Sequence, residues 1–412
     1  MNHVLGLRCA GCGKEFDARG MTYVCGACGK NLDVVYDYKA AGKTLTRAAL
    51  AGCADRSIWR YRDLYPLEGQ AGVMPLQVGW SPLYRADRLA GAVGAGALWV
   101  KDDGRNPSAS FKDRASAVAV AKAVELGFDK ICGASTGNAA SSTACLCASI
   151  GLRPIIFVPE TAPKAKIAQL LVFGAKVFAV KGTYDEAFDL CLQAAEEYGW
   201  YNRNTGYNPY TREGKKSCSF EICEQLGWEV PDLVLVPVGD GNILSGIWKG
   251  FRDLHGVGLI DRLPRLVAVQ SSRSSAIADA VNGDGVVRPV RATTIADSIS
   301  VDLPRDGEMA VRAVRDSTGM AVTVTDEEIL EAVPLLAREC GVFAEPAGAA
   351  SVAGLKKLAG EGGIRGCERV VCLVTGNGLK DVDTAMRIAG KTVPIAPDLG
   401  ALKKAVAAAK LA

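Results

Sequence analysis

Apolar residues along the chain follow two alternating patterns from about residue 97 onward. Short unbroken runs of valine, isoleucine and leucine, such as 154–160 and 232–239, predict strands buried on both faces, as in parallel sheets. Between these runs, apolar residues recur every three or four positions, which predicts amphipathic helices. We expect strands at 97–103, 130–135, 154–160, 176–180, 232–239, 265–270 and 369–376, and helices at 110–127, 138–151, 165–174, 184–199, 243–254, 325–340 and 401–412. This alternation predicts an α/β fold with two parallel sheets.

The segment 325–340 carries a clear helix-start signal. Thr325 is followed three residues later by Glu328, which is the pattern of a capping box. In that arrangement the two side chains satisfy backbone N–H groups that the first helical turn leaves unpaired. We therefore expect the helix to begin directly after Thr325.

The composition is that of a globular protein too long for a single hydrophobic core. Of its 412 residues, 49% are hydrophobic and 23% are charged, and the formal net charge is +3. No run of basic residues stands out, so nucleic acid is not an expected partner. No apolar stretch reaches the roughly 18 residues of a membrane span, and the first residues lack the apolar centre of a signal peptide. With 14 cysteines and no export signal, we expect a cytoplasmic protein whose thiols are free or bind metal.

The first 38 residues hold four of these cysteines in two matching pairs. Cys9 and Cys12 form one CxxC pair, and Cys25 and Cys28 form the second after an interval of twelve residues. Each pair can supply two thiolates from a tight turn, and two such turns complete a tetrahedral zinc site. We therefore expect a zinc ribbon with a structural or docking role, since few basic residues are present to bind nucleic acid. The alternatives are a ribbon that has lost its metal and a redox pair, for which one CxxC would suffice.

The scarcity of histidine narrows the possible chemistry. The chain has two, His3 and His255, so a mechanism built on a Ser–His or Cys–His pair lacks its usual general base. A bound cofactor would then carry the difficult step, with a lysine as the proton carrier. Lys112 is the candidate, because it follows Phe111 and a run of small residues, and an apolar setting favours the neutral, reactive amine. The alternative is an ordinary lysine in the first turn of a solvated helix.

The candidate ligand sites are loops at the ends of predicted strands, where open α/β sheets bind their ligands. The loop 102–113 presents Lys112, and 133–141 opens a helix with hydroxyl and backbone N–H groups suited to an anion. The turn 239–244 is a second candidate phosphate cradle, and a later strand ends at Thr375. Neither GxGxxG nor GxxxxGK[ST] occurs, so the dinucleotide and P-loop fingerprints are missing. A reactive lysine, two anion sites and a hydroxyl are the parts needed to hold pyridoxal phosphate and an amino acid.

Six stretches carry a resemblance to a known family. They are SIWRYRDLYPL at 57–67, NPSASFKDRAS at 106–116, STGNAASSTA at 135–144, VPVGDGN at 236–242, EPAGAAS at 345–351 and TGNGLKD at 375–381. They resemble the threonine synthase family of the tryptophan-synthase-β-like pyridoxal phosphate superfamily (fold type II), over about residues 57 to 390. The resemblance implies two α/β domains with parallel and mixed sheets, preceded by the ribbon. The implied division is a zinc ribbon at 1–38, a large cofactor-binding domain at 39–110 and 206–412, and a small mobile α/β domain at 111–205.

The resemblance also implies roles for individual residues. Lys112 would hold pyridoxal phosphate covalently and shuttle protons. Asn138 would bind the 3-oxygen of the cofactor, and Thr375 would face its pyridine nitrogen. The cofactor phosphate would lie in the turn made by Gly239, Asp240, Gly241, Asn242, Ile243 and Leu244. The substrate would bind through its carboxylate to Ser135, Thr136 and Ala139, and through its phosphate to Asn208, Arg212 and Lys215.

The implied reaction is that of a lyase acting on a phosphorylated amino acid: O-phosphohomoserine and water give L-threonine and phosphate. The family habit also implies a homodimer. Three places depart from the family pattern: the usual TPL reads SPL at 81–83, Asp240 stands in the phosphate turn, and Arg212 lies one position from the arginine of several relatives. The alternatives are a sister fold type II enzyme (a threonine/serine dehydratase or a phosphoserine-using cysteate synthase) and a zinc-ribbon binding protein on an inactive scaffold. The basic stretch 212–216 favours a phosphorylated substrate over the dehydratase.

Overall fold

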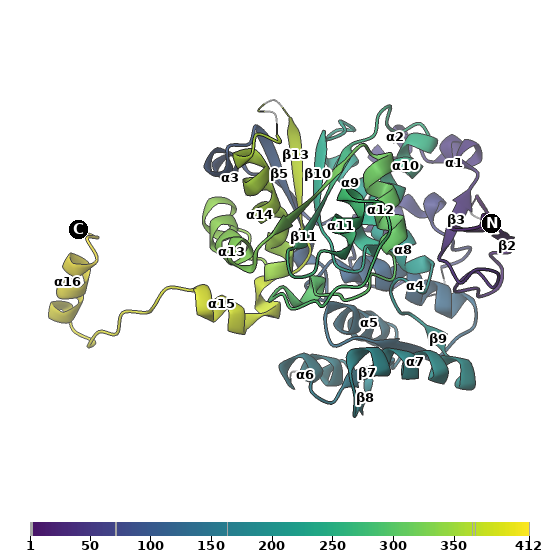
Figure 1. The fold of residues 1–412 in the computed structure, drawn as a ribbon, viewed down its shortest axis with the longest axis horizontal. Coiled ribbons are helices and arrows are strands. Elements are labelled where there is room, and N and C mark those ends of the chain that lie inside the picture. Colours follow the sequence, from purple (N-terminus) through teal and green to yellow (C-terminus); the bar gives the residue numbers. More distant parts are fainter. Residues whose placement is uncertain (1–2, 71, 163, 365, 367, 412) are drawn as a thin grey trace.

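The computed structural model describes residues 3–70, 72–162, 164–364, 366 and 368–411, which form three sheets (Figure 1). The strands are β1 Val4–Cys9, β2 Glu15–Phe16, β3 Leu32–Tyr36, β4 Leu83–Arg85, β5 Ala97–Asp102, β6 Ile131–Ala134, β7 Ile155–Pro159, β8 Lys176–Val180, β9 Tyr201–Asn202, β10 Leu233–Pro237, β11 Arg265–Ser271, β12 Met320–Val324 and β13 Arg369–Val374. The largest sheet has the order β12-β11-β10-β13-β5-β4, and within it the β4–β5 pair is antiparallel. The second sheet, β8-β7-β6-β9, is parallel, and the third, β2-β1-β3, is antiparallel. The α/β class and the mixed sheets are therefore as predicted.

Helices surround the two larger sheets (Figure 1). The α-helices are α1 Tyr38–Thr44, α2 Arg47–Ala51, α3 Asp87–Val93, α4 Lys112–Glu125, α5 Asn138–Ser149, α6 Lys164–Val172, α7 Tyr184–Tyr198, α8 Tyr210–Lys215, α9 Ser217–Gln225, α10 Asn242–Gly256, α11 Ala276–Asn282, α12 Gly307–Asp316, α13 Asp326–Cys340, α14 Pro346–Gly360, α15 Val382–Ile388 and α16 Leu399–Ala408. Short 3-10 turns lie at Ile58–Leu64, Asp103–Arg105, Asp297–Ile299 and Gly378–Lys380. The predicted capping box is present, with Thr325 and Glu328 each bonded to the other's backbone N–H ahead of α13.

The six-stranded sheet separates two hydrophobic cores. Because side chains alternate along a strand, Leu233 and Leu235 of β10 pack into one core with α13 and α14. Val234 and Val236 pack into the other, with α10 and α12. Both faces of the central strands are therefore buried, which is why their sequences are unbroken apolar runs.

The four-stranded sheet forms a second layer with α5, α6 and α7 around it (Figure 1). Its strands run from Ile131 to Asn202, a contiguous part of the chain. Helix α4 packs against α5 beside this sheet and also against α8, which follows it in the chain. The helix that begins at Lys112 therefore contacts both parts of the protein.

The N-terminal sheet is attached to α8 and α10 by polar contacts from its third strand. Arg212 donates from Nη1 to the backbone oxygen of Leu32 at 3.0 Å, and Lys249 donates to that of Val34 at 2.7 Å. Tyr36 donates its hydroxyl to Glu213 at 2.6 Å. The ribbon is thus held against the helices that flank the large sheet.

The C-terminal segment leaves the body of the protein as an extended arm that ends in α16 (Figure 1). No residue of α16 is buried, and Leu399 and Leu402 are 65% and 44% exposed. In the part of the chain that the structure describes, no helix has the length and apolar character required to cross a membrane.

Candidate active site

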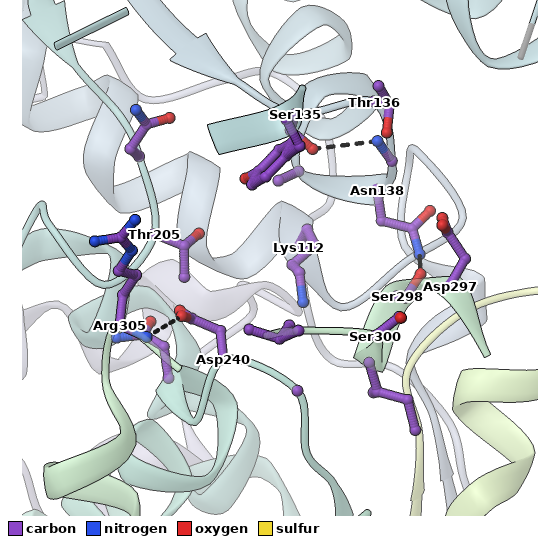
Figure 2. A pocket seen from close by; sticks show the side chains of 18 of the residues that line it. Lys112, Ser135, Thr136, Asn138, Thr205, Asp240, Asp297, Ser298, Ser300 and Arg305 are labelled. Carbon is purple, nitrogen blue, oxygen red and sulfur yellow. Dashed lines mark hydrogen bonds between the residues drawn. The ribbon is translucent and has the colours of Figure 1, made fainter. Parts of the chain in front are cut away.

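Strand ends from both large sheets open onto one cavity of about 640 Å³. Strand β6 leads into 135–139, β10 leads into 238–244 and β13 leads into Thr375, and all these residues line the cavity. The loop 297–303 completes part of the wall, and the side chain of Lys112 points into the space between these segments (Figure 2). The strand-end loops predicted from the sequence therefore meet at one place.

Lys112 lies in a setting that suits a reactive amine. It is the first residue of α4, and its Nζ has no hydrogen bond or ion pair with any residue that the structure describes. Burial, together with the guanidinium of Arg203, lowers the pKa of Lys112 to about 8, while the carboxylates of Glu345 and Asp240 act in the opposite direction. An amine with this pKa and no partner can form a covalent bond with an aldehyde near neutral pH.

The turn 239–244 presents unpaired backbone N–H groups at the start of α10. Gly241 has φ +90°, and a Cβ there would lie 2.9 Å from the Cβ of Ala310, so the position requires glycine. The N–H groups of 240–244 donate to none of the described residues, and no side chain caps the helix. Free N–H groups at the positive end of a helix dipole are a phosphate site. The turn therefore fits the phosphate of pyridoxal phosphate.

Asp240 within this turn is directed toward Arg305 (Figure 2). Its Oδ1 accepts a hydrogen bond from the backbone N–H of Arg305 at 2.7 Å, and its buried Oδ2 has no partner in the described structure. Burial, reinforced by the neighbouring Asp306, raises the pKa of Asp240 to about 7. Near neutral pH the carboxyl is therefore partly protonated, which lessens its repulsion of a phosphate.

Asn138, at the start of α5, lies on the side of Lys112 away from Asp240 (Figure 2). Its Nδ2 donates to Oε1 of Glu345 at 2.8 Å and to Oγ of Ser298 at 3.2 Å. Burial raises the pKa of Glu345 to about 7, so this carboxyl also carries only part of its charge near neutral pH. Asn138 is thus held by two side chains beside the position where the 3-oxygen of the cofactor is expected.

The loop expected to receive the substrate carboxylate forms the rim beside Asn138. Ser135, Thr136 and Ala139 line the cavity, and Oγ of Ser135 accepts a hydrogen bond from Gly137 N at 3.2 Å. Among the described residues no side chain caps α5, so the N–H groups of its first turn are free for an anion. Thr375 lines the wall at the end of β13, and its backbone oxygen accepts from Phe111 N at 2.8 Å, next to Lys112.

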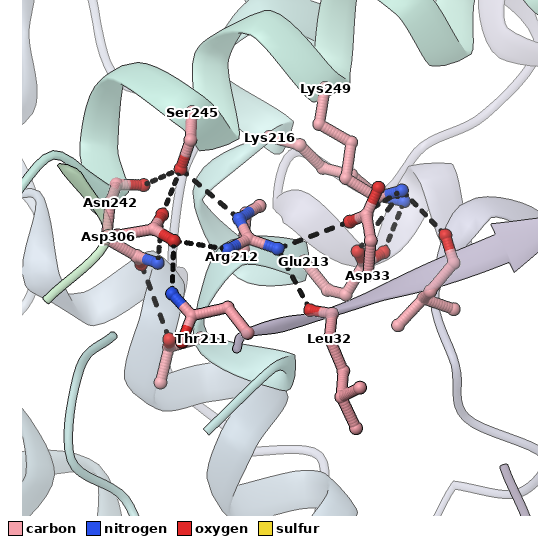
Figure 3. A network of polar contacts seen from close by, with 12 residues as sticks. Leu32, Asp33, Thr211, Arg212, Glu213, Lys216, Asn242, Ser245, Lys249 and Asp306 are labelled. Atoms are coloured by element: carbon pink, nitrogen blue, oxygen red, sulfur yellow. Dashed lines mark hydrogen bonds and ion pairs between the residues drawn. The ribbon is translucent and has the colours of Figure 1, made fainter. Parts of the chain in front are cut away.

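Arg212 does not lie in this cavity, so its expected role as a ligand of the substrate phosphate is not supported (Figure 3). Its buried guanidinium donates to Oδ1 of Asp306 at 2.6 Å and lies 3.3 Å from Oδ1 of Asp33. Helix α8 packs against α4 and α10, and this packing places Arg212 beside Asp306 and the backbone oxygen of Leu32 in the ribbon.

The other two residues expected at the substrate phosphate differ in their placement. Asn208 is buried and engaged with the backbone, because it donates to Asn202 O at 2.8 Å and accepts from Tyr210 N at 2.9 Å. It does not line the cavity. Lys215 does, and its Nζ donates to Oδ1 of Asn242 at 2.6 Å. Burial lowers the pKa of Lys215, with the charge of Lys112 adding to the effect.

Several lining residues were not identified from the sequence. Arg203 follows β9, and its guanidinium donates to the hydroxyls of Ser116 and Thr205. Its position after a strand end could have revealed it. Glu345 lies in the stretch EPAGAAS, but no local rule marks its carboxyl as part of the site. Ser298 and Arg305 come from a long loop without a motif.

The cavity concentrates positive charge that no carboxylate pairs directly. Lys112, Arg203 and Lys215 line it, and none of them has an ion pair within the described residues. The two nearby carboxyls, Asp240 and Glu345, have pKa values near 7 and compensate this charge only in part. Buried cations without partners are costly unless an anion joins them. The cavity is therefore suited to ligands with phosphate and carboxylate groups.

The four ribbon cysteines form a separate cluster. The Sγ atoms of Cys9, Cys12, Cys25 and Cys28 all lie within 4.8 Å of one another. Two of the separations are 3.4 Å, between Cys9 and Cys28, and 3.6 Å, between Cys12 and Cys25. Four thiolates placed about 2.3 Å from a tetrahedral zinc would be about 3.8 Å apart, so the cluster fits this metal.

Comparisons with known proteins agree with this geometry. Residues 74–376 match the family described as pyridoxal-phosphate dependent enzyme. The chain is 41% identical to the threonine synthase of Methanocaldococcus jannaschii over 400 residues, which cover 96% of this chain and 98% of that protein. It is 38% identical to the threonine synthase of Methanosarcina acetivorans, with 97% and 98% covered.

Solved structures share the fold at lower sequence identity. The processed threonine deaminase isoform 2 of Solanum lycopersicum superposes with a TM-score of 0.65 at 22% identity, covering 75% of this chain and 87% of that one. Maize serine racemase superposes with a TM-score of 0.63 at 20% identity, covering 80% and 92%. At these identities the likeness concerns the fold alone. The family match and the extended identity to two synthases show that this chain belongs to the pyridoxal-phosphate dependent enzyme family and, within it, to the threonine synthases.

Proposed function

We propose that the cavity around Lys112 carries out the threonine synthase reaction on O-phosphohomoserine. The bond between Cγ and the phosphate oxygen breaks, Cγ gains a proton, and Cβ loses a proton and gains the hydroxyl of water. The observation that carries this proposal is a group of three buried basic side chains around one cavity, Lys112, Arg203 and Lys215, which form no ion pair within the described residues. Both the cofactor and this substrate bring a phosphate to such a site.

Pyridoxal phosphate, when bound, supplies an electron sink for the carbanions of the reaction. The free Nζ of Lys112 would hold the cofactor and then move protons among Cα, Cβ and Cγ of the substrate. Backbone N–H groups of 240–244 would hold the cofactor phosphate, and Asn138 would orient the ring through its 3-oxygen. Thr375 would face the ring nitrogen, and the first turn of α5 would bind the substrate carboxylate.

For the substrate phosphate we propose Lys215 and Arg203 in place of Arg212. Both are cations in the cavity wall, and their present partners are uncharged: an amide oxygen for Lys215 and hydroxyls for Arg203. A dianionic phosphate would thus meet donors that no carboxylate already neutralises. Arg203 in particular offers a planar guanidinium suited to two phosphate oxygens.

A substrate comparison tests the proposed activity. The holoenzyme should release phosphate from O-phosphohomoserine with kcat/KM at least roughly tenfold above that for O-phosphoserine, since one methylene in a fitted site is worth about 10–200-fold. Phosphate release and threonine formation should match one to one. Faster turnover of O-phosphoserine would favour a cysteate synthase, and keto-acid release from threonine or serine without phosphate turnover would favour a dehydratase.

We propose that the ribbon binds one structural zinc ion through Cys9, Cys12, Cys25 and Cys28. The support is the close grouping of the four Sγ atoms. Such thiolates must stay reduced, which fits a cytoplasmic location.

The ribbon prediction is that Cys25→Ser lowers zinc from about one per chain to less than half, because a site that loses one of four ligands binds metal weakly. Metal analysis of protein prepared without chelator measures this. Cys53→Ser is the matched control, since Cys53 is a partly exposed cysteine outside the cluster. Equal zinc in both variants, or none in the parent protein, contradicts the proposal.

We also propose the domain division stated from the sequence, with the ribbon at 1–38, a large domain at 39–110 and 206–412, and a small mobile domain at 111–205. In its support, the strands of the four-stranded sheet all fall within 131–202, and those of the six-stranded sheet all fall outside this range. The cavity is lined by both parts, so movement of the small domain would open and close it.

We propose that the protein is a homodimer in which the C-terminal arm contacts a second copy. Apolar side chains are exposed along this whole segment, from Leu379, Val382 and Met386 on the body to Leu399 and Leu402 on the arm. A helix of ten residues with no buried side chain is marginal by itself, so it needs a partner surface. This series of exposed apolar side chains favours the same segment of a second copy as its partner.

Truncation after residue 389 should therefore shift the protein from dimer to monomer at micromolar concentration. Sedimentation velocity measures the change, and thermal unfolding of the truncated chain checks that its core remains folded. A parent protein that sediments as a monomer excludes the dimer. A truncated protein that stays dimeric excludes the arm as its contact.

A further inference from the structure

A second cavity, of about 310 Å³, lies between the ribbon and two helices of the large domain. Its walls come from β1 and β3 on one side and from α10 and α12 on the other. Among the residues that the structure describes, none lines both this cavity, here called the ribbon cavity, and the cavity around Lys112. It is therefore a separate space, which the threonine synthase reaction does not use.

In the deep part of the ribbon cavity, the lining carboxylates Asp33 and Asp253 lie close to cations. Asp33 lies 3.3 Å from both Arg212 and Lys249. Asp253 accepts hydrogen bonds from Lys216 at 2.6 Å and from the hydroxyl of Tyr38 at 2.7 Å. Despite burial, Lys249 and Arg212 hold the pKa of Asp33 low, and Arg252 at the mouth adds the smallest of these contributions, so Asp33 compensates Arg252 only in small part.

The mouth of the ribbon cavity carries cations that remain available. Arg252 of α10 is exposed and has no hydrogen bond or ion pair in the described structure. Arg312 of α12 is exposed and donates only to the backbone oxygen of Ala10, at 3.0 Å. Asp316 also lines the mouth but forms no ion pair with either arginine. Arg8, the third arginine, is paired with Glu15 at 2.8 Å.

A buried donor in the same wall also lacks a partner. Trp248 lies one helical turn before Arg252 on α10 and is 6% exposed. Its indole Nε1 is buried and makes no hydrogen bond in the described structure. Trp248 is part of the cavity wall, and its indole N–H has no acceptor among the described residues to lose if the side chain turns toward a ligand.

We propose that the ribbon cavity binds a small oxyanion with at least two negative charges, such as a phosphorylated or polycarboxylate metabolite. Arg252 and Arg312 approach the mouth from two different helices, and guanidinium groups bind such anions through paired hydrogen bonds. The indole N–H of Trp248 adds a neutral donor. The occupant would lie against both the ribbon and α10, whose first residue belongs to the phosphate turn of the active site.

A competing explanation assigns the arginines to the ribbon itself. Four thiolates around a zinc ion leave a net negative charge, and Arg8 and Arg312 lie beside Cys9 and Ala10. In that case the cations would stabilise the metal site and bind no ligand. The two explanations predict different responses to the same substitutions.

The test uses the zinc-loaded holoenzyme, with pyrophosphate and citrate as separate probes in isothermal titration calorimetry. The parent protein and Arg153→Gln, an exposed arginine elsewhere, should bind a probe equally. Arg252→Gln/Arg312→Gln should bind it at least roughly tenfold more weakly, as expected for losing two charge-assisted donors, with unchanged zinc content. Trp248→Phe should weaken binding by a smaller factor and reduce the tryptophan fluorescence change.

Preference for pyrophosphate or for citrate shows which of the two ligand classes, phosphorylated or polycarboxylate, the ribbon cavity binds. Absence of binding at millimolar concentration, equal affinity in the double variant, or a loss of zinc with unchanged anion binding would overturn the proposal.

Discussion

Replacing Lys112 with alanine should lower kcat for threonine formation by at least roughly 10³-fold. Loss of a group that transfers protons costs about 10²–10⁴-fold, and this variant also loses the covalent bond to the cofactor. The variant should still fold, because the Lys112 amine has no hydrogen bond or ion pair to lose within the described structure. Steady-state kinetics measure the loss of kcat, and thermal unfolding checks that the variant is folded.

Borohydride reduction followed by mass spectrometry supplies a second readout for this residue. In the parent protein the pyridoxal adduct should be found on Lys112, and in Lys112→Ala no lysine should carry it. Lys391→Ala, which changes an exposed lysine far along the chain, is the control and should behave as the parent. If Lys112→Ala keeps a tenth or more of the parent activity, Lys112 is not the catalytic lysine.

The pH dependence of cofactor uptake follows from the same side chain. The neutral amine reacts with the aldehyde, and the pKa of Lys112 is lowered to about 8. The rate of uptake by the cofactor-free protein should therefore rise about tenfold per pH unit below pH 8 and level off above it. Removing the neighbouring charge with Arg203→Gln should raise the pKa and move the midpoint to higher pH. An unchanged midpoint would show that Arg203 does not influence this amine.

Arg212→Ala should lower the free energy of unfolding by about 3–5 kcal/mol, the usual loss when one partner of a buried ion pair is removed. Arg212 and Asp306 are both buried and 2.6 Å apart, and the carboxylates of Asp306 and Asp33 raise the pKa of the guanidinium despite its burial. Without Arg212 the Asp306 carboxylate keeps Asn31, Asn242 and Ser245 as donors but loses its cation.

The same substitution should also weaken cofactor binding. Asp306 accepts from Nδ2 of Asn242 at 2.9 Å, and Asn242 begins the helix whose free N–H groups form the phosphate turn. Disturbing Asp306 therefore disturbs the turn, although Arg212 itself does not line the cavity. The visible absorbance of the cofactor at increasing pyridoxal phosphate concentration measures this affinity.

Two further variants distinguish the loss of the Arg212–Asp306 ion pair from nonspecific destabilisation. Arg153→Ala removes an exposed arginine and should change stability by less than about 0.5 kcal/mol. Arg212→Met/Asp306→Asn leaves no unpaired charge, so its loss should be smaller than the sum of the two single losses. If Arg212→Ala leaves stability and cofactor affinity unchanged but abolishes turnover of O-phosphohomoserine, the arginine binds substrate phosphate after all.

The sequence by itself determined the features that depend on residues close together along the chain. Unbroken apolar runs such as 232–239 are strands because burial on both faces excludes polar side chains. The start of α13 follows from Thr325 and Glu328, which satisfy N–H groups three residues away. The paired CxxC motifs predicted the cysteine cluster, since each knuckle is a short local turn. The position of Lys112 at the start of a helix likewise followed from local patterns.

The tertiary structure decided the partners of the polar side chains. From the sequence Arg212 was expected to bind phosphate beside Lys215, because residues three apart lie on one helix face. In the folded protein Arg212 instead contacts Asp306 and the backbone of Leu32, whereas Lys215 lines the cavity around Lys112. Glu345 meets Asn138 across more than 200 residues, and the ribbon cavity exists only where β3 packs on α10. No local pattern encodes such contacts, because they depend on how whole helices and sheets pack together. The sequence therefore determined which segments form the site, and packing determined which charges face it.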